Sequence, residues 1–110
     1  MLRFDLASRA FNLGLRLIRQ GGGYGVQPYD PNATVGPAAS MQFHLNNVHL
    51  NEYGIFLSGL KLAALAQVTP NSVSIVADIP LGTHNAQPFR GGVLLNDTEA
   101  DSIVWWTPER

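Results

Sequence analysis

The chain has 110 residues, of which 45% are hydrophobic, a formal net charge of −1 and no cysteine. This length favours one domain with a single modest core and argues against a large enzyme cleft, while the lack of cysteine excludes disulfides and thiolate metal sites. Charged residues make up only 14%, against about 25% in a typical soluble domain, so weak self-repulsion favours association with partners.

Residues 1–20 are predicted to form an amphipathic α-helix. On a helical wheel of about 100° per residue the apolar side chains span an arc of roughly 220°, which is wider than one core can cover. The conformational entropy lost when such a helix is ordered costs about as much free energy as burial of its apolar side chains provides. We therefore expect the helix to be stable only when docked between neighbours. The predicted docking residues are Leu2, Phe4, Leu6, Phe11, Leu13, Leu15, Leu17 and Ile18 on the apolar arc, with Arg9, Arg16 and Arg19 on the cationic stripe.

Residues 21–40 are predicted to be an extended arm. Glycine and proline dominate this segment, and neither strand nor helix periodicity survives in it. The glycines that follow residue 20 are expected to end the helix, with Gly21 at the C′ position. About 20 extended residues reach at most roughly 70 Å, a distance that would carry the helix onto a neighbouring subunit.

Residues 41–110 are predicted to form a small β-rich body. Alternating apolar side chains predict a strand at residues 41–45, continued by Val48 and Leu50 after a bulge at Asn46 and Asn47.

The remaining elements of this body follow from pattern and turn signals. Residues 55–57 favour a strand and residues 60–68 a short helix, far shorter than the roughly 20 residues that span a membrane. Residues 73–79 predict a further strand, and residues 93–95 and 102–106 predict a hairpin around the sequence NDTEAD. The expected fold class is therefore mostly β (α+β): an antiparallel sheet or sandwich body with an N-terminal helix and an arm.

Several segments resemble ligand-binding motifs without completing them. The sequence GGGYG at residues 21–25 lacks the third glycine of a dinucleotide fingerprint and follows a predicted helix, and residues 54–62 lack the Lys-Ser/Thr pair of a Walker A loop. Asp97, Glu99 and Asp101 alternate like calcium ligands but lack the glycine and the later glutamate of an EF-hand. We expect no cofactor and no metal.

Three histidines are the candidates for catalysis. His44 and His49 face opposite sides of a regular strand, and His84 lies in a distant loop. Because no nucleophile with an evident base accompanies them, we expect no enzyme. A small enzyme whose site forms between copies, using these histidines, remains an alternative.

Trp105 and Trp106 are predicted interface residues. Neighbours on a strand face opposite ways, so one indole can fill the core while the other covers a partner; burial of both within the chain is the alternative. The arginines of residues 1–20 lack interleaved aromatic residues, which argues against nucleic-acid binding.

The sequence therefore predicts a non-enzymatic structural or interaction subunit, docked through its helix and arm onto copies of itself or a larger scaffold protein. A virion accessory or capsid-stabilising protein is the favoured instance, and a virion the favoured location, by analogy of architecture alone. Attachment to a membrane surface through the helix, or membership of a mitochondrial complex, are the alternatives. We expect neither a secretory signal nor a transmembrane helix.

Overall fold

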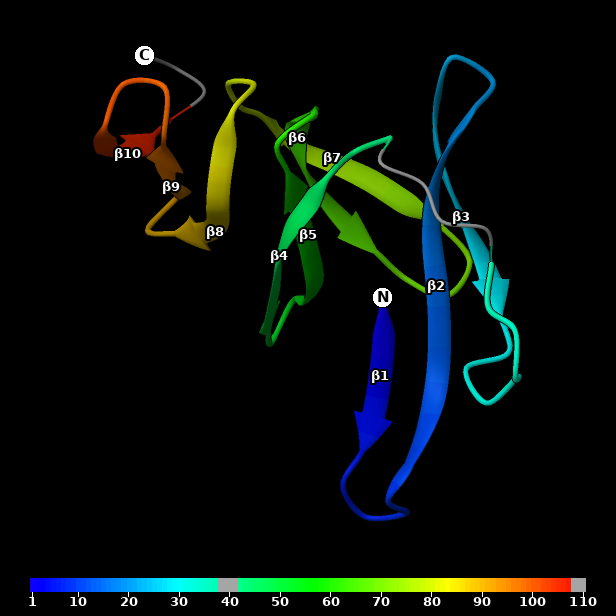
Figure 1. The fold of residues 1–110 in the computed structure, drawn as a ribbon. Coiled ribbons are helices and arrows are strands. Elements are labelled where there is room, and N and C mark those ends of the chain that lie inside the picture. The colour runs from blue at the N-terminus through cyan, green and yellow to red at the C-terminus, as the bar shows by residue number, and fades with distance from the viewer. Residues whose placement is uncertain (38–41, 108–110) are drawn as a thin grey trace. The chain divides into compact units, whose positions relative to one another are not determined.

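The computed structural model describes residues 1–37 and 42–107, and all regular structure in these residues is β-strand (Figure 1). The predicted α+β class and the predicted N-terminal helix are therefore wrong. None of the described elements is a helix that could cross a membrane. The strands are β1 (Leu2–Asp5), β2 (Ala10–Gln20), β3 (Gly23–Tyr29), β4 (Leu45–Asn51), β5 (Gly54–Gly59), β6 (Leu62–Val68), β7 (Val73–Asp78), β8 (Thr83–Phe89), β9 (Gly92–Asp97) and β10 (Ser102–Trp106).

The strands form three antiparallel sheets in two compact units. The sheet orders are β1-β2-β3, β4-β5-β6-β7 and β10-β9-β8. One unit is Met1–Ser40 with Thr69–Val73, and the other is Met41–Val68 with Ser74–Arg110. The first sheet belongs to the first unit, and the second unit contains the third sheet and nearly all of the second.

The segment predicted to be a helix forms β1 and β2 because its side chains alternate. In β2, Leu13, Leu15 and Leu17 alternate with Gly14 and Arg16, which is the period of a strand. An apolar arc as wide as 220° was weak support for a helix, since an amphipathic surface helix has a much narrower face. β1 pairs with the first part of β2, residues 10–14, and β3 with the second part, residues 14–20, so strand pairing supports β2 along its length.

The segment predicted to be an arm begins with a hairpin turn and β3. Gly21 and Gly22 have φ angles of 55° and 81°, and they connect the paired residues Gln20 and Gly23. Two residues with positive φ form the turn that matches the twist of a hairpin, and glycine adopts it without strain. The glycines therefore reverse the chain instead of ending a helix.

The four-stranded sheet corrects two further predictions. The strand predicted at residues 41–45 begins only at Leu45: His44 has a φ of 48°, and Met41 lies outside the described residues. The expected bulge is present, because Leu45 pairs with Gly59 and Asn47 with Ser58, which leaves Asn46 as the extra residue.

The segment 60–68, predicted to be a helix, contains β6. Leu65 and Ala66 are neighbours on opposite faces of this strand, and both are at most 1% exposed. A strand buried on both faces loses its polar alternation, so its sequence resembles that of a buried helix.

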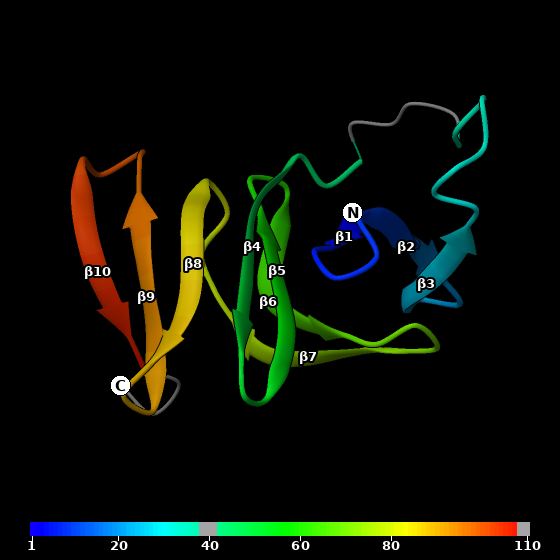
Figure 2. The same ribbon diagram turned by 90° about the horizontal axis from the view of Figure 1, so that it is seen from below.

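The last sheet confirms the predicted hairpin and adds a strand that the sequence did not indicate. β9 and β10 pair antiparallel around the acidic turn, as expected. In the four-stranded sheet, β7 occupies the strand predicted at residues 73–79. β8, with the sequence THNAQPF, lies in a segment predicted to be a loop. Figure 2 shows β8 beside β4 and β5, with β9 and β10 following in order away from them.

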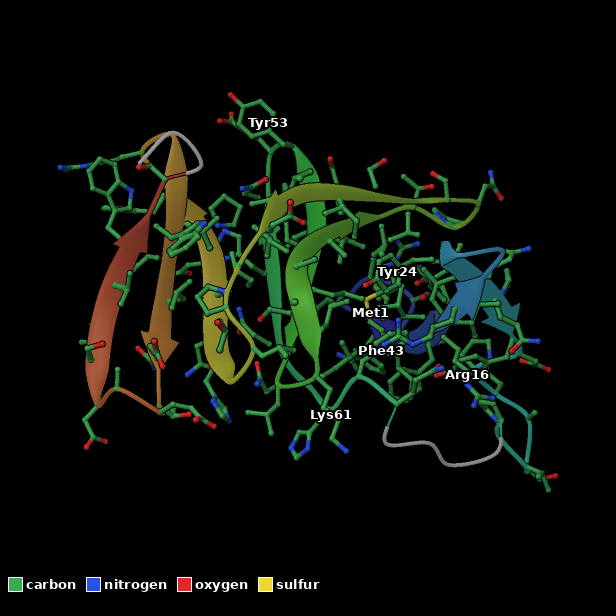
Figure 3. The ribbon with its side chains drawn as sticks, turned by 90° about the horizontal axis from the view of Figure 1, so that it is seen from above. Met1, Arg16, Tyr24, Phe43, Tyr53 and Lys61 are labelled. Atoms are coloured by element: carbon green, nitrogen blue, oxygen red, sulfur yellow. The ribbon has the colours of Figure 1, made fainter. Side chains whose placement is uncertain are left out.

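The core of the second unit lies between its two sheets. Tyr53 in the β4–β5 turn and Lys61 in the β5–β6 turn are both exposed and lie at opposite ends of the four-stranded sheet (Figure 3). Between these ends, six buried side chains form one cluster against which Ala77 and Val104 pack. The cluster consists of Phe56, Leu65, Ile79, Ala86, Val93 and Leu95.

Gly59 is required where the backbone before β4 crosses the end of β5. The N–H of Leu60 donates to the His44 carbonyl, and the N–H of Lys61 donates to the Phe43 carbonyl, both at 3.0 Å. A Cβ on Gly59 would lie 2.5 Å from the Phe43 oxygen and 2.9 Å from the His44 oxygen. Both neighbours are backbone atoms held by these bonds, so neither can move away cheaply.

We therefore expect Gly59→Ala to lower the free energy of unfolding by about 1–3 kcal/mol, the usual cost of overpacking. Gly36→Ala is the matched control, because nothing lies within 4 Å of its added Cβ. Urea denaturation followed by tryptophan fluorescence measures both changes. Equal stability of the two variants would show that the backbone at Phe43 and His44 leaves room for a Cβ on residue 59.

Candidate interaction surfaces

An exposed apolar cluster lies on β1, the β1–β2 turn and the start of β2. We call it the amino-terminal patch: Leu2, Phe4, Leu6 and Phe11. Leu6 is 84% exposed, and the rings of Phe4 and Phe11 meet edge to face with centroids 5.2 Å apart. Aromatic pairs favour this geometry, so the two rings form a joint apolar surface that faces solvent.

A bulge in β2 turns this patch away from the buried face of the sheet. Arg3 pairs with Leu13 and Phe4 with Phe11, so Asn12 is the extra residue. An extra residue reverses the alternation beyond it, and Phe11 therefore lies on the face opposite Leu13. The side chain of Asn12 accepts a hydrogen bond from Arg3 Nε at 2.9 Å. This bond links the bulged residue to β1.

The first residue is built into the same sheet. The amino group of Met1 donates to the Leu15 carbonyl at 2.7 Å, and the N–H of Leu15 donates back to the Met1 carbonyl at 2.9 Å. The Tyr29 hydroxyl donates to the same Met1 carbonyl at 3.2 Å. Burial lowers the pKa of the Met1 amino group below its ordinary value of 8.0, because the charged form loses solvation.

The turn before β2 is polar and closes on itself. Hydrogen bonds from the hydroxyl and the backbone N–H of Ser8 lower the pKa of the Asp5 carboxyl. Arg9 in this turn is exposed with a φ of 56°, and the Arg19 guanidinium lies over the Tyr24 ring, 5.8 Å from its centroid. Asp5 and Arg9 therefore place charged groups at the β1–β2 turn beside the amino-terminal patch, whereas Arg19 lies at the other end of β2.

The structure does not bring the predicted docking residues of residues 1–20 onto one surface. Four of them form the amino-terminal patch, Leu15 and Leu17 are buried, and Leu13 and Ile18 are half-buried. Of the arginines, Arg9 and Arg19 are exposed and Arg16 is half-buried. Neighbouring side chains of a strand point to opposite faces. The docking residues that would share one side of a helix are therefore divided between the two faces of the sheet.

A second exposed apolar surface lies on β10. Ile103 is 77% exposed, Trp105 55% and Trp106 37%, so neither indole fills the core. Ile103 and Trp105 share the face opposite the core, while Val104 packs against the core. By the same alternation Trp106 lies on the other face, where it is partly exposed. We call Ile103 and Trp105 the β10 surface. Ile103 was not among the predicted interface residues, although its alternation with Trp105 was a signal for it.

Trp105 is held in place across the sheet. Its indole N–H donates to the Phe89 carbonyl on β8 at 3.0 Å. The ring passes over Gly92, where a Cβ would lie 2.6 Å from the indole nitrogen. The Arg90 guanidinium covers the Phe89 ring at 5.1 Å. The indole therefore presents a fixed apolar face to solvent, as interface aromatic residues do.

The other edge of this sheet, at β8, is closed by side chains. The Asn46 amide donates to the Thr83 carbonyl at 3.0 Å, and its oxygen accepts the N–H of Asn85 at 3.3 Å. The Asn47 amide donates to the Ala86 carbonyl at 2.9 Å.

The buried Ser58 hydroxyl completes this closure. It accepts the N–H of Ala86 at 3.2 Å. The bulge at Asn46 and the positive φ of Asn85, 54°, bring these groups together. The sequence predicts the bulge but not the hydrogen bonds that it makes to β8, because these bonds join residues up to 39 positions apart.

The histidines lie in separate environments. His44 is exposed, the ring of His49 lies 6.4 Å from that of Phe56, and His84 Nδ1 lies 3.3 Å from both the Gly82 carbonyl and the Thr98 hydroxyl. In residues 1–37 and 42–107 no group of three or more metal-binding side chains could hold an ion. Asp97 accepts the N–H of Ala100 and so stabilises its own turn.

A hollow of about 180 Å³ opens beside the core of the second unit. This volume is close to that of an engineered protein cavity, about 150 Å³, that holds benzene. Its lining carries no ionisable side chain: Phe56, Leu65, Val76, Ala77, Pro88, Gly91, Gly92 and Val93. The hollow can accept an apolar group and offers it no acid, base or nucleophile.

We expect Asn47→Ala and Asn47→Asp each to lower the free energy of unfolding by about 1–3 kcal/mol, because both leave the carbonyl of the buried Ala86 without its donor. Asn71→Ala, at an exposed turn, should change it by less than about 0.5 kcal/mol. Chemical denaturation measures all three. An Asn47→Asp variant as stable as the parent would contradict the closure of β8 by this amide.

The Met1 amino group should make stability depend on pH below 8.0. Its pKa is lowered in the folded chain, so between that value and 8.0 the unfolded chain binds more protons, and the free energy of unfolding rises with pH. Acetylation of this amine should abolish that rise, because it removes the group that takes up the proton. Unfolding curves of both forms across this range test the difference; parallel pH profiles would rule out the effect.

The chain matches no protein-family model, no curated protein and no solved structure. A function for it therefore comes from the geometry of its own residues.

Proposed function

We propose that the chain is a non-enzymatic interaction subunit that docks on protein partners through the amino-terminal patch. The observation that supports this is the exposure of four large apolar side chains on β1, the β1–β2 turn and the start of β2: Leu2, Phe4, Leu6 and Phe11. Large apolar side chains gathered in one exposed place mark interaction sites in soluble proteins, whereas scattered ones do not.

The surroundings of the patch fit a protein interface. The edge-to-face rings of Phe4 and Phe11 form an apolar centre, and Asp5, Arg9 and the Arg3–Asn12 hydrogen bond provide polar groups near it. Interfaces commonly combine an aromatic centre with a polar rim. The bulge at Asn12 prearranges this face, so docking requires little reordering of the chain.

The expected partners are copies of this chain or a larger scaffold protein. The low share of charged residues, 14%, supports both, because little repulsion opposes close approach. Among the described residues nothing favours a capsid over any other assembly. The alternative of membrane attachment relied on an amphipathic helix, and the described residues contain no helix.

Isolated chain should self-associate through the patch when its partner is missing. We expect the sedimentation coefficient of the parent chain to rise with concentration, and the rise to be reduced in a Phe4→Ser/Leu6→Ser variant, because both side chains are exposed in the single chain. Val35→Ser is the matched control, since Val35 is 81% exposed outside the patch.

Sedimentation velocity over a wide concentration range measures this. The proposal is contradicted if the double variant and the Val35 control associate equally, because the patch would then contribute nothing to assembly.

A further inference from the structure

The backbone of β10 is open on the side away from β9. Among the described residues no strand pairs with that side, and Figure 2 shows β10 at the outer end of its sheet. The opposite edge, at β8, is closed by Asn46, Asn47 and Ser58. The sheet can therefore be extended only at β10.

The β8–β9 turn determines which groups of β10 are free. Arg90 and Gly91, with φ angles of 47° and 74°, form a two-residue hairpin turn, which makes Phe89 and Gly92 a hydrogen-bonded pair. Hydrogen bonding alternates along β9, so the next residue, Val93, bonds toward β10 instead.

The same alternation continues into β10. Val93 is paired with Trp106 and Leu95 with Val104, so Trp106 and Val104 bond to β9. Ile103 and Trp105 then direct their N–H and C=O groups away from the sheet. These four groups form a short open ladder.

We propose that β10 pairs antiparallel with β10 of a second copy of this chain, forming a continuous six-stranded sheet across a two-fold axis. This inference rests on the proposed assembly role and names one of the partners. Full overlap of the five residues of β10 places Val104 opposite Val104 of the second copy. Ile103 then faces Trp105 of the second copy, and each such pair exchanges both of its free backbone hydrogen bonds.

The side chains suit this register. Each Ile103 lies opposite a Trp105 on the face away from the core, and β-branched with aromatic pairs are favourable across strands. The Trp105 ring leans over Gly92 of its own sheet, so Ile103 packs beside the ring and not against its open face. Both are exposed in the single chain, so the pairing buries surface that is otherwise in water. No residue of β10 is charged, and an edge without charge has none of the usual protection against pairing.

Charge selects the antiparallel orientation. The β9–β10 turn carries Asp97, Glu99 and Asp101 at one end of the sheet, and Arg90 lies at the other end. Antiparallel pairing brings the acidic end of one copy beside the Arg90 end of the other, whereas parallel pairing would bring the two acidic turns together. The acidic turn of one copy and Arg90 of the other are about three strand spacings, about 14 Å, apart, so salt should weaken this preference.

A single cysteine tests the register. In the proposed pairing Val104 is a non-hydrogen-bonded position with Cα atoms about 4.5 Å apart, within the range that a disulfide spans. The chain has no cysteine of its own, so Val104→Cys provides one thiol. We expect mild oxidation to give a disulfide dimer in high yield, and at least several-fold less from Val48→Cys, an exposed position on β4.

A proline at the edge tests the backbone bonds. Ile103→Pro removes an N–H that points away from β9, and proline is tolerated at such edge positions. We expect this variant to stay folded and to raise the dissociation constant of the dimer about tenfold or more, since two symmetry-related bonds are lost. Ile103→Thr, which keeps the N–H, should weaken the dimer less. If Val104→Cys fails to fold, this comparison decides.

The two proposals fail separately. Cross-linking of Val104→Cys that persists when Phe4→Ser/Leu6→Ser is added would support the β10 pairing independently of the amino-terminal patch. A Val104→Cys yield no higher than that of Val48→Cys, or an Ile103→Pro variant that dimerises like Ile103→Thr, would overturn the pairing and leave the edge to a different chain. Patch-dependent sedimentation would survive that result.

Discussion

The hydrogen bonds from Asn46, Asn47 and Ser58 to β8 are the interaction on which the second unit depends. β8 places two residues, Asn85 and Ala86, opposite one position of β9, and a regular strand cannot pair along such a kinked edge. Side chains from β4 and β5 supply the missing partners instead. Without them, buried backbone groups beside the core would lack hydrogen bonds, at a cost of about 1–3 kcal/mol each.

This closure directs growth of the sheet to the other side. A sheet that is blocked at β8 and open at β10 has one edge for a partner, and exposed apolar side chains lie along that edge. Natural sheets usually protect an open edge with charge, proline or a bulge. The five residues of β10 have none of these, which is consistent with an edge that is covered in an assembly.

Bulges at two asparagines arrange the surfaces of the chain. Asn12 reverses the alternation of β2, so that Phe11 joins Phe4 in the amino-terminal patch while Leu13 and Leu15 lie on the other face. Asn46 interrupts β4 and reaches β8 with both its amide and its oxygen. The two proposed surfaces differ in chemistry: the patch offers apolar area, and β10 offers open backbone hydrogen bonds as well. A subunit with both can join two neighbours in different ways.

The sequence by itself determined the local features: the β-rich body, the β9–β10 hairpin around its acidic turn, the strand at β7 and the bulge at Asn46. Each of these depends on neighbours a few positions apart. Tertiary structure decided the rest. Residues 1–20 carry apolar side chains that suit either a wide helical arc or an alternating strand, and only pairing through the Gly21–Gly22 turn settles the choice. β6 is buried on both faces and loses its alternation. β8 pairs with β9, and amides 37 and 39 residues away bond to its other edge. Contacts at that separation leave no periodic pattern in the chain, since the free energy that selects them comes from groups that meet only after folding.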